Sequence, residues 1–83
     1  MPITIRYVAA LRDRMGRAED VLDLPPGIAD SDALVAHLRA SRPEADMLAH
    51  PSVRLIRNED IVPRPAPLAD GDTIAFCPPF TGG

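Results

Sequence analysis

The stretch that decides the fold is Leu68-Ala69-Asp70-Gly71-Asp72-Thr73-Ile74-Ala75-Phe76-Cys77-Pro78-Pro79-Phe80-Thr81-Gly82-Gly83. An Asp-Gly turn signal opens it at residues 70–71. The five residues after that turn, Thr73–Cys77, predict a last strand with Ile74 and Phe76 on one face. Everything before residue 68 has to supply the neighbours for this strand.

Two prolines end that strand. Pro78 and Pro79 lack a backbone N–H and have a fixed φ, so neither can continue as a central-strand residue, and both favour an extended chain. Gly82 and Gly83 carry no side chain, which makes the terminus thin enough to enter a narrow channel. We therefore expect residues 78–83 to form a protruding tail.

The working group of the tail would be the carboxylate of Gly83. An ionised carboxylate is a poor acyl electrophile, so it has to be activated before it reacts. The simplest activation is an acyl-adenylate made from ATP by another protein. The alternative is that the two glycines are only the end of a domain, because domain ends are commonly without function.

The whole chain has the size and composition of one soluble domain. Its 83 residues are 46% hydrophobic and 25% charged, and the net charge is −3. An acidic chain is unsuited to nucleic acid, which favours a basic face. No apolar run approaches the roughly 20 residues of a membrane span. The start of the chain lacks the features of a signal peptide, so we expect a cytoplasmic protein.

Cysteine, lysine and histidine are scarce. Cys77 is the single cysteine and is interpreted as a small packed apolar residue. All nine basic residues are arginine, so the chain contains no lysine to accept its own terminus. His37 and His50 are too few and too far apart to predict a metal site, and both are expected at the surface.

The first part of the chain predicts two strands around a short helix. Ile3–Val8 alternates apolar and polar residues, as a strand with one buried face does. Ala9–Met15 predicts a helix, with Gly16 as the residue that ends it. Glu19–Leu24 predicts a second strand, antiparallel to the first.

The middle of the chain predicts the main helix and two more strands. Asp30-Ser31-Asp32 is an N-cap cluster for a helix over Ala33–Ala40, which has to end near Arg42 because Pro43 follows. Glu44–Pro51 is expected to be a connection, with a short turn of helix under Met47 and Leu48 as an option. Val53–Arg57 predicts a third strand, and Ile61–Val62 predicts a very short extended piece at a proline-rich edge.

This order, β-α-β-α-β-β-β, predicts an α+β domain of two layers. A mixed sheet of four or five strands would pack against one main helix, with the last strand parallel to the first. We expect residues 1–83 to form a single domain.

The order and the ending resemble the ubiquitin-like β-grasp sulfur carriers, and most closely the molybdopterin synthase small subunit (MoaD) family. The residues that carry the resemblance are 3–16, the helix around 34–39, and 68–83, with the Asp-Gly-Asp turn, Pro-Pro and Gly-Gly as the specific part. Cys77 stands where that family often has a larger apolar residue, and Phe80 where it often has a smaller one. Residues 58–64 also resemble the thiamine-pathway sulfur carriers.

The resemblance implies a carrier without catalytic residues or a bound cofactor of its own. A ubiquitin-activating-like adenylyltransferase would use ATP and magnesium to adenylate Gly83, and a sulfur donor protein would convert it to a thiocarboxylate. The loaded tail would then enter the large subunit of molybdopterin synthase, in a heterotetramer, and give sulfur to cyclic pyranopterin monophosphate.

Roles for the other tail residues follow from the same resemblance. Gly82, Thr81 and Phe80 would line the partner's channel, with Phe80 as an apolar anchor. Pro79 and Pro78 would hold the tail extended, which lowers the entropy lost on insertion. Phe76 and the exposed face of the last strand are candidates for the docking surface, with core packing as the alternative for Phe76.

Three other functions stay open. The chain could carry sulfur for another product, such as thiazole, a thiolated tRNA base or cysteine. It could be a ubiquitin-like modifier that forms amide bonds from Gly83 to lysines of other proteins. It could also be a plain interaction module with an idle tail.

Overall fold

The computed structural model describes residues 1–78, and residues 79–83 lie outside that description. Five strands form one sheet in the order β2-β1-β5-β3-β4, and β5 is its middle strand. The strands are β1 (Ile3–Tyr7), β2 (Glu19–Leu22), β3 (Arg54–Arg57), β4 (Asp60–Val62) and β5 (Thr73–Cys77). The helices are α1 (Ala10–Met15), α2 (Ser31–Ser41) and the 3₁₀ helix η1 (Pro43–Ala49).

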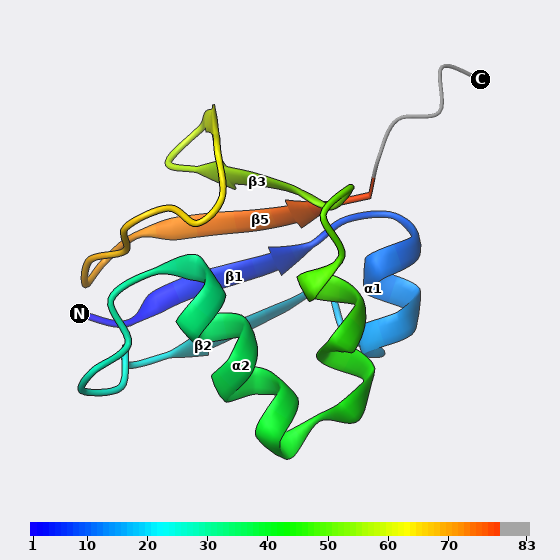
Figure 1. The fold of residues 1–83 in the computed structure, drawn as a ribbon, viewed down its shortest axis with the longest axis horizontal. Helices are drawn as coiled ribbons and strands as arrows, with labels where there is room; N and C mark the ends of the chain where they lie inside the picture. Colours follow the sequence, from blue (N-terminus) through cyan, green and yellow to red (C-terminus); the bar gives the residue numbers. More distant parts are fainter. Residues whose placement is uncertain (79–83) are drawn as a thin grey trace.

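The sheet is mixed, as the sequence predicts. β1 pairs antiparallel with β2 and parallel with β5, and β3 pairs antiparallel with both β4 and β5. The parallel pair is possible because α2 and the segments around it provide the long crossover between β1 and β5. Figure 1 shows α2 lying across the sheet and α1 beside the end at which β1 and β5 finish.

Local sequence signals start and stop the helices where expected. The side chain of Asp30 accepts a hydrogen bond from the backbone N–H of Ala33 at 2.8 Å, which caps α2. α2 ends at Ser41, and its C-cap is Arg42, immediately before Pro43. Gly16 ends α1 with φ 73°, a left-handed conformation that glycine adopts without strain.

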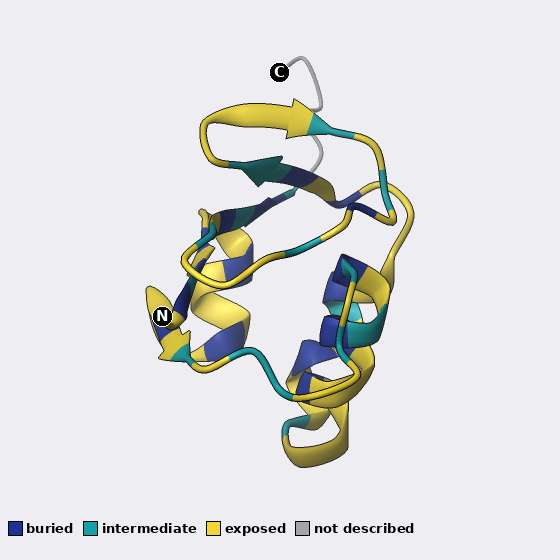
Figure 2. Cartoon of the chain, turned by 90° about the vertical axis from the view of Figure 1, so that its left-hand side faces the viewer, coloured by how far each residue is buried: buried dark blue, intermediate teal, exposed yellow. Residues whose placement is uncertain are grey.

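One hydrophobic core joins the two layers. Ile3, Ile5 and Tyr7 of β1 are buried together with Leu34, Val35 and Leu38 of α2. Figure 2 shows the buried residues on the sides of the sheet and of the helices that face each other. The alternation in β1 and the apolar stripe of α2 are therefore both confirmed.

The ends of most elements differ by one or two residues from the sequence predictions. β2 ends at Leu22 instead of Leu24, and Val8 and Val53 lie just outside β1 and β3. The connection expected over 44–51 is mostly η1, so the helical turn under Met47 and Leu48 is present and is longer than a single short turn. It buries Ala45 and Leu48, and this tertiary packing extends a turn that weak local propensity alone would leave short.

Candidate functional site at the end of the last strand

The backbone of β5 is held on both sides almost to the tail. Phe76 is paired with Tyr7 of β1, and Cys77 with Arg54 of β3. The backbone N–H of Val8 donates to the Phe76 carbonyl at 3.2 Å. Pro78 follows outside the strand and is half-buried, so the regular sheet ends one residue before it, as predicted. Whatever follows Pro78 therefore starts from a fixed point.

Five of the predicted site residues lie outside the described part of the chain: Pro79, Phe80, Thr81, Gly82 and Gly83. Their predicted roles, including that of Gly83 as the reacting group, stay predictions. Pro78 is the tail residue that the structure places, at the end of the sheet.

The docking role predicted for Phe76 is wrong. Its side chain is 0% exposed and belongs to the core, so it cannot contact a partner while the domain stays folded. Its burial follows from register, since Phe76 lies opposite the buried Tyr7 and Leu55. The alternative interpretation, core packing, is the correct one.

The other face of β5 lies in a row that crosses the sheet and consists of three apolar residues and one arginine. Cross-strand pairs place Arg6, Ala75, Ile56 and Ile61 next to one another on β1, β5, β3 and β4, and we call these four residues the open row. Ile61 is 69% exposed, and Ala75 and Ile56 are half-buried. The exposed face of β5 was predicted as a docking surface, but Ile56 and Ile61 were not, because only the strand order brings them beside Ala75.

Cys77 lies on the same side of β5 as Ala75 but is buried. Burial raises the pKa of its thiol, because a low-dielectric surrounding disfavours the thiolate. A thiol with a raised pKa is a weak nucleophile at neutral pH. The interpretation of Cys77 as a packed residue is confirmed.

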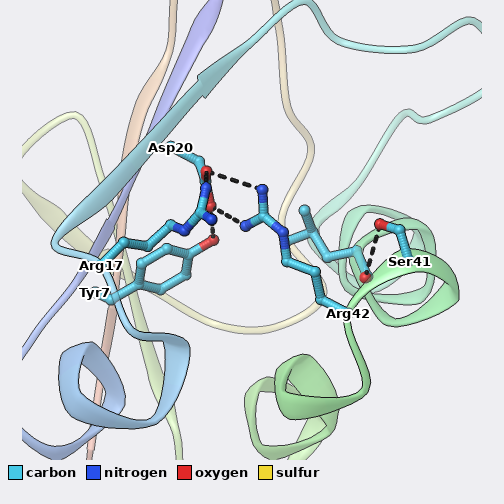
Figure 3. A network of polar contacts seen from close by, with 6 residues as sticks. Tyr7, Arg17, Asp20, Ser41 and Arg42 are labelled. Carbon is cyan, nitrogen blue, oxygen red and sulfur yellow. Dashed lines mark hydrogen bonds and ion pairs between the residues drawn. The ribbon is translucent and has the colours of Figure 1, made fainter.

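An ionic cluster centred on the buried Asp20 lies at the C-terminal end of α2 (Figure 3). Asp20 of β2 accepts hydrogen bonds from the Tyr7 hydroxyl and from Arg17, both at 2.8 Å, and its two oxygens receive the guanidinium of Arg42. Burial of Asp20 disfavours its charged form, but the hydrogen bonds from Arg42, Tyr7 and Arg17 outweigh it and lower the pKa to about 2. The carboxylate is therefore ionised and joins β1, β2 and the end of α2.

A second arginine braces the region next to the tail. The Arg64 guanidinium donates to the carbonyls of Leu48 and Val53 at 2.6 and 2.9 Å and lies 5.6 Å from the centroid of the Phe76 ring. It thereby connects η1 and the start of β3 to the last core residue of β5. The sequence gives no local signal for this role, since Arg64 lies in a proline-rich loop.

Within residues 1–78, no group of three or more His, Cys, Asp or Glu residues is arranged to hold a metal ion. His37 and His50 are exposed, as expected. Over the same residues, no helix combines the length and the apolar character needed to cross a bilayer.

A five-stranded mixed sheet in the order β2-β1-β5-β3-β4, with one main helix across it, is the architecture of the β-grasp, ubiquitin-like class. The comparisons with known proteins agree with this class. The sequence profile of the ThiS family matches residues 5–83. The chain belongs to the ThiS family, and the predicted resemblance to the β-grasp sulfur carriers is confirmed.

Three individual proteins illustrate the relationship. The molybdopterin synthase sulfur carrier subunit of Chlamydomonas reinhardtii is 32% identical over 84 residues, covering 100% of both chains. The small archaeal modifier protein 1 of Methanosarcina acetivorans has a similar fold, with a TM-score of 0.77 at 18% identity over 99% of this chain and 96% of that one. Subunits 1 and 2 of the molybdopterin-converting factor of Helicobacter pylori form a complex whose matching chain gives a TM-score of 0.65 at 20% identity, with 100% of both chains covered.

Proposed function

We propose that this chain is the sulfur carrier subunit of a molybdopterin synthase and that Gly83 carries the sulfur. The observation that supports this most is the placement of β5, the middle strand, which is paired on both sides up to Cys77 and is followed at once by Pro78. A strand that is paired on both sides up to its last residue fixes the point from which the tail starts. Such a fixed starting point suits a tail that reacts in the active sites of other proteins. The match to the ThiS family extends to residue 83, and the Chlamydomonas relative is named for the same role.

The chemistry proposed for Gly83 has two steps. First, its carboxylate attacks the α-phosphorus of ATP on an adenylating partner, which also holds the magnesium ion, and pyrophosphate leaves. Second, hydrosulfide released by a sulfur donor protein attacks the acyl carbon, and AMP leaves together with one of the carboxylate oxygens, so that a thiocarboxylate remains on Gly83. In this proposal the catalytic groups belong to the partners, and the chain supplies a substrate.

The thiocarboxylate then donates its sulfur to cyclic pyranopterin monophosphate in the large subunit of the synthase. A thiocarboxylate is a sulfur nucleophile: its sulfur would bond to a carbon of the substrate and displace an oxygen leaving group. Water would then cleave the acyl–sulfur bond, which leaves the sulfur on the substrate and returns the ordinary carboxylate of Gly83. We propose that the open row takes part in docking to that subunit, because Ile61 and its half-buried neighbours Ile56 and Ala75 offer apolar area on a face of the sheet. Two carriers and two large subunits would form the heterotetramer.

The test is to charge the chain in vitro. The protein is incubated with an adenylating enzyme, ATP, magnesium and a sulfur source, and its intact mass is measured. A gain equal to the replacement of one oxygen by one sulfur supports the proposal. A matched variant with one alanine added after Gly83 should stay folded and unchanged in mass. An unmodified mass for the natural chain, under conditions that charge a known carrier, would contradict the proposal.

A ubiquitin-like modifier is the second candidate, favoured by the fold of the small archaeal modifier protein 1. It would use the same adenylate but form amide bonds to lysines of other proteins. Such adducts have higher mass and resist thiols, whereas the thiocarboxylate is lost on sulfur transfer. A carrier for another product is distinguished by the large subunit that copurifies with the chain and by the product that this pair makes.

A further inference from the structure

An apolar cleft of about 240 Å³ opens beside the point where β5 ends. It lies between α1 and η1 and is lined by Ala10, Leu11, Met47, His50, Ser52, Val53 and Pro78. The Ser52 hydroxyl and Nδ1 of His50 are paired with each other at 2.6 Å, and the other lining side chains are apolar. The cleft therefore suits an apolar side chain.

The wall of the cleft is held in place from behind. One side of the cleft is formed by residues 47–53. Arg64 donates hydrogen bonds to three backbone carbonyls of this segment, those of Leu48, His50 and Val53. Leu11 and Val53 are themselves buried, whereas Met47 is half-buried. A braced wall cannot collapse to fill the space, so a site of this shape persists in the unbound protein.

The side chain best placed along the chain to reach the cleft is that of Phe80. Pro78 is part of the lining, and Phe80 follows two residues later, within about 7.6 Å between Cα atoms. Phe80 is also the one aromatic side chain among residues 79–83. Met47 offers a thioether to the ring, a contact that stabilises sulfur–aromatic pairs.

We propose that the ring of Phe80 occupies this cleft when the chain is not bound to a partner. The gain from burying one phenyl ring is of the same order as the entropy lost on fixing two residues, of which Pro79 already has a restricted φ. The contact is therefore reversible: it holds the start of the tail against the body and is broken when a partner draws the tail away. This inference goes beyond sulfur transfer and does not depend on it.

The experiment is methyl NMR on the full chain without any partner. In the natural protein, the Phe80 ring should give nuclear Overhauser contacts to the Met47 methyl and shift the methyl signals of Met47, Leu11 and Val53. Phe80→Ala should abolish both effects. The matched control, Thr81→Ala, changes the adjacent tail residue and should leave these methyl signals where they are.

Two outcomes overturn the proposal. One is the absence of ring contacts together with identical methyl signals in the natural protein and in Phe80→Ala. The other is a ring contact that weakens on dilution, which would assign the cleft to Phe80 of a second copy. Sulfur loading is not measured here, so a failure of this inference is distinguishable from a failure of the proposed function.

Discussion

Replacing Asp20 with asparagine removes the carboxylate that accepts hydrogen bonds from Tyr7, Arg17 and Arg42. The side chain of Asp20 is 8% exposed, so solvent screens these contacts weakly. The pKa of Asp20 is lowered from 3.8 to about 2. At about 1.4 kcal/mol per pKa unit, this shift corresponds to about 2 kcal/mol of stabilisation at neutral pH.

The expected loss for Asp20→Asn is about 2–3 kcal/mol at pH 7, because the half-buried Arg42 guanidinium also loses its charged partner. An 83-residue domain has a free energy of unfolding of roughly 4–12 kcal/mol, so the loss is a large fraction of the total. The measurement is urea unfolding followed by far-ultraviolet circular dichroism. Glu19→Gln is the matched control, since it removes an exposed ion pair to Arg6 at 3.7 Å and should cost less than about 1 kcal/mol.

The pH dependence tests the cause. The folded-state pKa of Asp20 lies below its unfolded value, so its stabilisation is complete above about pH 5 and is lost as the pH falls through about 2. The difference between the natural protein and Asp20→Asn should therefore shrink steadily below pH 4. Equal stabilities at pH 7, or a difference that persists unchanged at pH 2, would refute the reasoning.

Four further substitutions test the rest of the structure. Phe76→Ala should lower the free energy of unfolding by about 3–5 kcal/mol in urea, and a loss below about 1 kcal/mol would contradict its place in the core. Gly16→Ala should cost about 1 kcal/mol by thermal unfolding, since a Cβ there meets no atom within 4 Å and the strain comes from φ 73° alone; an unchanged melting temperature would be inconsistent with that conformation. Arg64→Lys should cost about 1–3 kcal/mol in urea, because an ammonium group cannot reproduce the planar fork that reaches carbonyls on η1 and before β3; unaltered stability would argue against the brace. Ile61→Glu should change stability by less than about 0.5 kcal/mol, since the side chain is 69% exposed, but weaken binding to the large subunit about tenfold or more in calorimetry. Unchanged affinity for that variant would remove the open row from the docking surface.

The parts of the fold that depend on neighbouring residues were predictable from the sequence. The alternation in Ile3–Tyr7 predicts a strand with one buried face, and the Asp30 cap and Pro43 place both ends of α2. The turn before Thr73 and the proline after Cys77 place β5. Each of these signals acts through φ, ψ and hydrogen bonds within a few residues, which is why they can be interpreted without a structure.

The contacts between distant residues were decided by the tertiary structure alone. Asp20 and Arg42 are 22 positions apart and meet because β2 and the end of α2 are brought together around one core. Phe76 and Ala75 look equally available in the sequence, yet pairing with Tyr7 and Leu55 turns Phe76 inward and leaves Ala75 beside Ile56. Local propensity specifies what each segment becomes, whereas strand order and the closing of the core select which residue faces which. That selection depends on the free energy of burying all the core residues together. These residues come from every part of the chain, so no short stretch of sequence specifies it.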